Sequence, residues 1–224
     1  FMLEGLADCE AMLAARGIPL VARYGDPGKI ALELSERAAA VICDRSYMPL
    51  PRQWRAKLAE KAGCPIIQVE TEVVVPVDVA SNKSEYAART IRPRIHRVWD
   101  EYLVPLEETE LDNVGKEIFI ESDIDVSEPA AALKKLQIDR TVRPVKRFRG
   151  GRVEALRRLQ YFIDDVLDGY STGRNEPSAA LTSFLSPYLH FGHISPLEIA
   201  LEVRKSGHGS VEDRSSFIEE LIVR

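Results

Sequence analysis

The feature that most constrains this fold is the alternation, in the first 70 residues, of short apolar runs with helical segments that start at capping residues. The apolar runs are continuous rather than interrupted at every second position, which is typical of strands buried on both faces of a parallel sheet. One helical segment starts at Asp26-Pro27, because aspartate accepts bonds from free helical N–H groups and proline suits the first turn. We therefore expect βα units with parallel strands near 18–24, 39–43 and 65–69, and helices over 1–17, 27–37 and 51–61.

The rest of the chain divides into a connection and a helical region. A helical pattern covers 84–103, and Pro93 within it is expected to kink or interrupt the helix. Residues 104–150 are acidic at first and then rich in arginine, proline and glycine, as in a connection that crosses a surface. Helical periodicity returns at Arg152. The predicted fold is a Rossmann-like α/β domain at 1–103, a linker at 104–150 and the start of an all-α domain at 151–224.

The composition is that of an ordinary globular protein and excludes several classes. The chain has 224 residues, a formal net charge of −5 and 45% hydrophobic residues, too apolar for a disordered chain. No run approaches the roughly 18 apolar residues of a membrane helix. Three scattered cysteines give neither a disulfide framework nor a metal pair, so we expect a cytoplasmic or nuclear protein without a metal. Both ends stop within apolar patterns, which indicates a piece of a longer chain.

Two polar segments are candidate binding sites. Residues 182–186 place three hydroxyl groups before a short helical pattern. Ser186 and Pro187 are expected to be the N-cap and a first-turn residue of that helix, and a helix start surrounded by hydroxyls can seat a pyrophosphate. An ordinary helix start, like the one at Ser195, is the alternative. The basic run at 140–158 has two possible roles, an interdomain brace or a contact with phosphates.

Glu220 is the candidate for a functional acid. It lies in the apolar run 217–223, where one face of a helix would be buried. A carboxylate in such a place needs a partner and often marks a site. Arg224 follows four residues later, so a purely structural ion pair stays the alternative.

Five motifs follow one another along nearly the whole chain. They are Gly25-Asp-Pro27, Ser84-Glu-Tyr-Ala-Ala-Arg-Thr-Ile-Arg-Pro93, Tyr170-Ser-Thr-Gly-Arg-Asn-Glu-Pro177, Leu185-Ser-Pro-Tyr-Leu-His-Phe-Gly192 and Glu219-Glu-Leu-Ile-Val-Arg224. Together they resemble the class II cyclobutane pyrimidine dimer (CPD) DNA photolyases of the photolyase/cryptochrome family. The resemblance implies a flavoenzyme that repairs ultraviolet-damaged DNA by electron transfer from light-excited, reduced FAD. It also implies an antenna-type α/β domain, with a chromophore of the deazaflavin or folate type, before a helical FAD-binding domain.

The resemblance assigns roles to individual residues. Glu220 would be the catalytic carboxylate that hydrogen-bonds the dimer base, and Arg174 and Arg224 would contact DNA. The FAD contacts would come from Tyr170, Thr182, Ser183, Phe184, Leu185 and Ser186. We expect a monomer that binds damaged DNA and no membrane, and an inactive chain when this piece stands alone. A cryptochrome-like photoreceptor without repair activity and a non-catalytic nucleotide-binding α/β module stay open.

Overall fold

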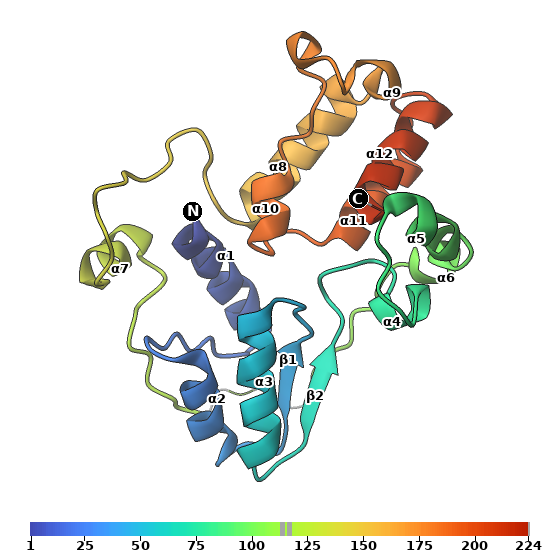
Figure 1. Cartoon of the computed structure of the whole chain (residues 1–224). Coiled ribbons are helices and arrows are strands. Elements are labelled where there is room, and N and C mark those ends of the chain that lie inside the picture. The colour runs from blue at the N-terminus through green and yellow to red at the C-terminus, as the bar shows by residue number, and fades with distance from the viewer. Residues whose placement is uncertain (113–114, 116–117, 224) are drawn as a thin grey trace. The chain divides into compact units, whose positions relative to one another are not determined.

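The computed structural model describes residues 1–112, 115 and 118–223 (Figure 1). The chain groups into two compact units. The larger unit comprises Phe1–Leu20, Val73–Phe119 and Val126–Arg224, and the smaller one comprises Val21–Glu72 and Ile120–Asp125.

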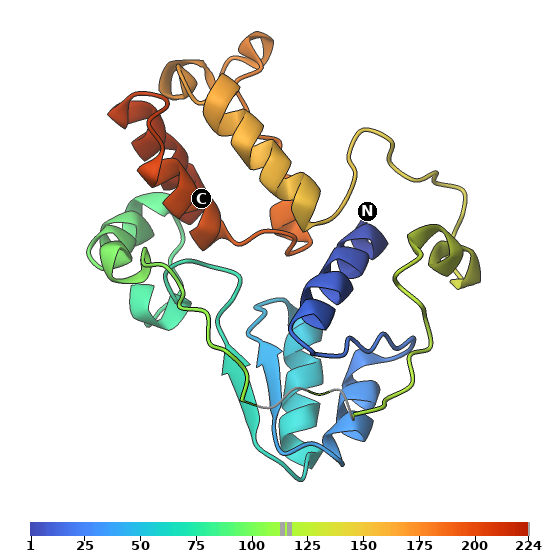
Figure 2. The same cartoon turned by 180° about the vertical axis from the view of Figure 1, so that it is seen from behind.

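The smaller unit contains the sheet. Strands β1 (Val41–Asp44) and β2 (Ile66–Val69) pair in parallel. Helix α3 (Pro49–Lys61) connects them, and α2 (Pro27–Ser35) packs against α3 (Figures 1 and 2). The Asp26 carboxylate caps α2 by accepting a hydrogen bond from the Lys29 N–H at 2.9 Å. The structure thus confirms the parallel pairing and the predicted cap.

The predicted strand at 18–24 is wrong, since no strand forms there. The N–H of Ala22 bonds to the Ser122 hydroxyl at 3.1 Å, and the N–H of Tyr24 bonds to the Asp123 carboxylate at 2.9 Å. The N–H of Asp123 returns a bond to the Ala22 carbonyl at 2.9 Å. These backbone groups are therefore satisfied by a segment about 100 residues later in the chain, which replaces a strand ladder.

The prediction that the sheet is buried on both faces is also wrong for the residues that the structure describes. The side chain of Ile42 on β1 is 68% exposed, and that of Ile67 on β2 is 48% exposed. Neighbouring strand residues point to opposite faces, and Val41 and Ile66 are partly buried. One face of the two-stranded sheet is therefore packed and the other is open.

The larger unit is helical. Its elements are α1 (Met2–Ala15), α4 (Val77–Ala80), α5 (Ala88–His96), α6 (Trp99–Tyr102), α7 (Pro129–Lys135), α8 (Arg152–Tyr161), the π-helix η2 (Phe162–Val166), α9 (Tyr170–Gly173), the 3₁₀ turn η3 (Pro177–Ala179), α10 (Ser186–His190), α11 (Pro196–Lys205) and α12 (Val211–Val223). Its main core contains Phe162, Leu167, Leu185, Tyr188, Ile199 and Val203, each almost completely buried. This core joins α8 and η2 to α9–α12. Helix α1 packs against α7 and α8 in this same unit, and the predicted domain boundaries at 103 and 151 stay a prediction.

The single helix expected over 84–103 is divided into α5 and α6. Pro93 does not interrupt α5, which continues to His96. The break comes instead at Arg97–Val98, where the chain turns and the His96 ring stacks on the Trp99 ring, with centres 4.4 Å apart. Trp99 packs against the core, so tertiary packing of this aromatic side chain accompanies the end of the helix.

Candidate functional site

The structure brings together three residues to which the sequence assigned separate roles. Glu220 lies on α12, and Arg174 follows α9 directly. Arg174 Nη1 is 2.6 Å from Glu220 Oε1, and the two side chains are only 22% and 27% exposed. The Arg174 guanidinium carbon is also 5.8 Å from the centre of the Tyr170 ring, one helical turn earlier. The predicted catalytic acid, one predicted DNA contact and one predicted FAD contact therefore form one cluster.

Charge and burial determine the protonation of this cluster. The hydrogen bond with Glu220 raises the pKa of Arg174 above its ordinary value. Burial raises the pKa of the Tyr170 phenol, an effect that Arg174 only partly offsets. At neutral pH the cluster therefore contains a fixed cation, bonded to the acid and held against a neutral phenol.

The neighbouring acid, Glu219, faces a different helix. Its carboxylate is 2.5 Å from Arg92 Nε and 2.6 Å from His96 Nε2, both on α5. Burial opposes ionisation of Glu219, but these hydrogen bonds outweigh it and lower the pKa of the carboxyl. Two adjacent carboxylates thus bind two separate elements. The predicted role of Arg224 concerns a residue outside the described part of the chain. Arg174 is an ion partner of Glu220 among the described residues.

The hydroxyl-rich segment before α10 presents a mixture of exposed and buried side chains. Thr182 and Ser186 are exposed, whereas Leu185 is 1% exposed and belongs to the main core. The expectation that Ser186 caps α10 is wrong, because the N-cap is Leu185 and no side chain caps this helix. Ser183 instead accepts a 3.3 Å bond from the Leu185 N–H. The Thr182 and Ser186 hydroxyls are therefore placed where they could meet a ligand from solvent.

Phe184 holds the segment in an uncommon backbone conformation. Its φ angle is +54°, a left-handed value that is costly for a residue with a bulky side chain. The guanidinium carbon of Arg147 lies 4.9 Å from the centre of its ring, a cation–π contact. Leu181, just before the segment, packs against Gly173 of α9, where any added Cβ would lie 2.4 Å from the Leu181 side chain. The segment is thus fixed from both sides, by the basic run and by α9.

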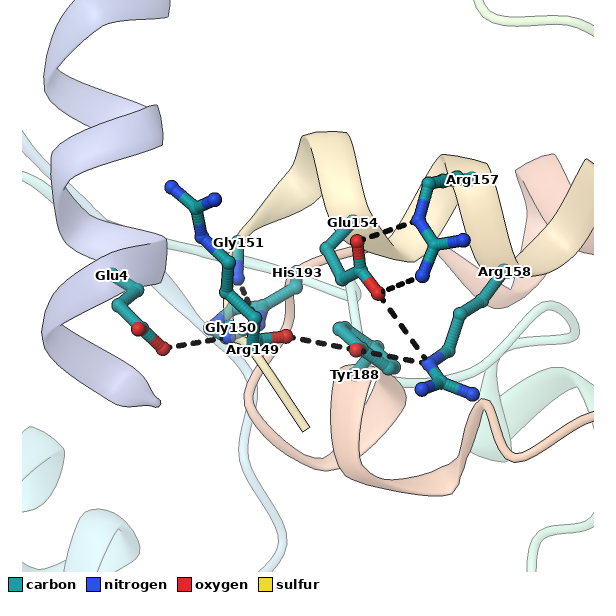
Figure 3. A network of polar contacts seen from close by, with 9 residues as sticks. All are labelled: Glu4, Arg149, Gly150, Gly151, Glu154, Arg157, Arg158, Tyr188 and His193. Atoms are coloured by element: carbon teal, nitrogen blue, oxygen red, sulfur yellow. Dashed lines mark hydrogen bonds and ion pairs between the residues drawn. The ribbon is translucent and has the colours of Figure 1, made fainter. Parts of the chain in front are cut away.

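Most arginines of the basic run 140–158 contact other residues of the larger unit. The Tyr188 hydroxyl donates to the Arg149 carbonyl at 2.8 Å and accepts from Arg158 Nε at 3.2 Å (Figure 3). Other contacts are those of Arg140 with carbonyls of α7 and the next residue, Arg152 with Glu198, and Arg157 with Glu154. These contacts are internal to the larger unit. The interdomain brace and the contact with phosphates therefore both stay predictions.

The smaller unit contains a pocket that was not predicted from the sequence. It has a volume of about 470 Å³ and is lined by Arg45, Ser46, Tyr47, Arg52, Arg55, Ala56, Ala59 and Gln68. Arg45 directly follows β1, so the pocket lies at the carboxyl end of this strand, where ligands of parallel α/β sheets usually bind. Arg55 donates to the Ser46 carbonyl at 2.6 Å, while its buried Nε has no acceptor among the described residues. Three arginines after a predicted strand were the signal that could have revealed it.

Comparisons with known proteins agree with this arrangement. Residues 1–111 match the DNA photolyase family. A deoxyribodipyrimidine photo-lyase from Methanothermobacter thermautotrophicus is 35% identical over all of this chain and 48% of its own length, and one from Oryza sativa is 34% identical over all of this chain and 46% of its own length. The chain belongs to the photolyase and cryptochrome family. It spans about half the length of the curated relatives it matches.

Solved structures give the same fold. A class III photolyase from Agrobacterium tumefaciens matches with a TM-score of 0.75 and 26% identity, covering 99% of this chain and 47% of the other. A Synechocystis cryptochrome matches with a TM-score of 0.75 and 19% identity, covering 98% and 47%. These matches confirm the α/β fold class with a small parallel sheet and many helices. None of the helices that the structure describes is long and apolar enough to cross a membrane.

Proposed function

We propose that this chain forms the α/β unit and part of the FAD- and DNA-contacting unit of a class II CPD photolyase. The observation that carries the proposal is the cluster of Tyr170, Arg174 and Glu220, because it joins the residues that the resemblance assigns to flavin, DNA and dimer. The relatives named deoxyribodipyrimidine photo-lyase support repair, and the Glu219–Arg224 motif is the basis for class II. Residues 104–150 would be the linker between the two domains.

The described residues fit a bound FAD. The exposed hydroxyls of Thr182 and Ser186 can donate to phosphate oxygens, and the buried Leu185 fixes the backbone beneath them. Tyr170 is 8% exposed and would present its edge to the cofactor from α9. Reduced FAD, when bound and excited by light, would supply the electron that opens the cyclobutane ring.

Glu220 and Arg174 would act on the damaged bases. The Glu220 carboxylate can accept a hydrogen bond from the N–H edge of a dimer that has been flipped out of the duplex. Arg174 holds this carboxylate in place and keeps positive charge beside the DNA backbone. A preorganised, partly buried acceptor needs no rearrangement when charge develops on the dimer. The substrate is then DNA, and the protein would work inside the cell as a monomer.

The arginine-lined pocket of the smaller unit would hold the antenna chromophore. Arg45, Arg52 and Arg55 suit a ligand that carries carboxylate or phosphate groups. Tyr47 lines the pocket as well, so its wall includes an aromatic ring, over which the Arg45 guanidinium lies at 5.6 Å. A deazaflavin or a folate with an acidic tail would meet both features.

The experiment that tests this function uses the protein expressed from its complete reading frame. It is mixed with an oligonucleotide that contains one thymine dimer, and the recovery of intact thymines is measured in light and in darkness. Repair in light only is expected, together with a flavin spectrum. A flavin-containing protein that repairs nothing in light would favour the cryptochrome-like photoreceptor. A protein without flavin bands would favour the nucleotide-binding module.

A further inference from the structure

One buried carboxylate outside the proposed site binds the starts of two helices. Asp213 lies in the first turn of α12 and is 3% exposed. It accepts bonds from the Ser210 N–H at 3.0 Å and hydroxyl at 2.7 Å, and its own N–H donates to the Ser210 hydroxyl at 3.0 Å. This reciprocal pair caps α12. Asp213 also accepts from the Ser171 N–H at 2.7 Å and the Gly169 N–H at 3.3 Å, so it caps α9 as well.

The contacts of α12 with α9 lie along one face. Asp213, Phe217 and Glu220 are spaced at i, i+4 and i+7, which places them in one row along a helix. Asp213 binds the start of α9, the Phe217 ring packs edge-on against the Tyr170 ring with centres 5.3 Å apart, and Glu220 binds Arg174. The row covers about 10 Å of helix at 1.5 Å per residue. A charged side chain at each end of the row, Asp213 or Glu220, therefore contacts α9 or the residue that directly follows it.

Helix α9 needs such an anchor. It has four residues, Tyr170–Gly173, and a single turn is too short to be stable on its own. Gly169 before it has φ +81°, so the preceding backbone restrains the helix little. The first N–H groups of a helix lack partners within it, and Asp213 accepts from this turn. The backbone bond from Ser171 lowers the pKa of the Asp213 carboxyl, consistent with an ionised anchor.

We propose that Asp213 is a positioning residue for the lesion-binding site: it fixes α9 on α12 and thereby holds Arg174 against Glu220. The effect on repair rests on the proposed function, whereas the structural link does not. Asp213 itself meets neither DNA nor flavin in this scheme. It acts at the opposite end of the row from Glu220.

The structural link is tested by nuclear magnetic resonance of the arginine side chains in this chain. An ion-paired guanidinium rotates slowly and gives separate Hη signals, and Arg174→Lys assigns those of Arg174. We expect these signals to merge in Asp213→Asn at temperatures well below the melting temperature of the variant. The asparagine NH2 group would face N–H donors at one of the two positions where a carboxylate oxygen of Asp213 accepts hydrogen bonds. Ser171→Pro should do the same, since it removes the donor of the 2.7 Å bond and leaves α12 intact.

Two control variants separate positioning from capping alone. Ser210→Ala weakens the cap of α12 and spares the bond to Ser171. Asp8→Asn weakens another carboxylate cap in the same unit, the 3.1 Å bond from the Val153 N–H of α8. Both should lower stability and leave the Arg174 signals separate. Unchanged Arg174 signals in Asp213→Asn and Ser171→Pro, or merged signals in the controls, would overturn the proposal.

A double-mutant cycle tests the consequence for function in the protein from the complete reading frame. Asp213→Asn should weaken binding of dimer-containing DNA about tenfold, a typical coupling for residues in one network. In the Arg174→Ala background the same substitution should cost nothing further, because the group through which it acts is gone. Additive losses would contradict the proposal. If the parent protein does not bind dimers at all, the proposed function fails, and the resonance experiment still decides the structural link.

Discussion

Replacing Glu220 by glutamine is the sharpest test of the site, because it removes a charge and preserves shape. The carboxylate is 2.6 Å from Arg174 and both side chains are less than one-third exposed, so solvent screens the pair only in part. Glutamine keeps one acceptor oxygen. The contact with Arg174 then changes from an ion pair to a hydrogen bond from a cation to a neutral amide. The lost charge–charge attraction of this partly buried pair lies between that of an exposed pair, roughly 0–1 kcal/mol, and that of a buried pair, roughly 3–5 kcal/mol.

The expected loss of stability is therefore about 1–2 kcal/mol, or a fall of about 2–8 °C in melting temperature for a chain of this size. Flavin content should barely change, because the predicted FAD contacts are Tyr170 and residues 182–186. The dimer should lose a comparable amount of stabilisation, which reduces ring splitting by a factor of about 5–30 relative to competing return of the electron. Glu220→Ala, which removes the acceptor altogether, should lower repair further.

The assay measures repair of an oligonucleotide with one defined thymine dimer under saturating light, with flavin content and melting temperature taken on the same samples. Glu219→Gln is the matched control, since this neighbouring carboxylate is also ion-paired but faces Arg92 and His96 on α5. It should lose similar stability and keep its repair activity. Parental repair by Glu220→Gln would refute the catalytic role. Equal losses of repair in both variants, with loss of flavin, would make Glu220 a structural residue.

Three further predictions concern other parts of the chain. Hydrogen bonds in the folded state lower the pKa of Asp213. Its contribution to stability is therefore present above the unfolded pKa of about 3.9 and is lost as the pH falls below that value. Urea unfolding from pH 6 to pH 2 should show a shallower decline of the free energy of unfolding in Asp213→Asn than in the parent. The 224-residue chain, which spans 48% of its archaeal relative, should lose FAD on dialysis, whereas the protein from the complete reading frame should retain it; stoichiometric flavin after dialysis of the short chain would contradict this. Arg55→Ala should weaken binding of an acidic chromophore about tenfold, by loss of a charged hydrogen bond, and fluorescence titration with a folate and with a deazaflavin would measure it.

The sequence by itself determined the features that depend on neighbouring residues. Asp26 caps α2, and Ser195 caps α11 by accepting a 3.2 Å bond from the Leu197 N–H, because a cap needs only a side chain within three residues of the free N–H groups. The parallel pairing of β1 with β2 also followed from local signals, since a strand, a helix and a second strand joined by short loops favour parallel strands. The apolar run 217–223 indicated a carboxylate that needs a partner, and Glu220 forms an ion pair with Arg174.

Only the tertiary structure decided which groups become partners. Glu220 forms an ion pair with Arg174, which lies 46 positions earlier in the chain and which no local spacing indicates. Residues 22–24 bond to side chains about 100 positions later, which is why an apolar run that resembles a strand forms none. Asp213 would pass in the sequence as an ordinary cap of α12, and its bond to Ser171 of α9 arises only when the two helices pack. Apolar periodicity shows which face of a helix is buried, but the partner across that face depends on how the chain closes distant loops, and neighbouring residues carry no information about that.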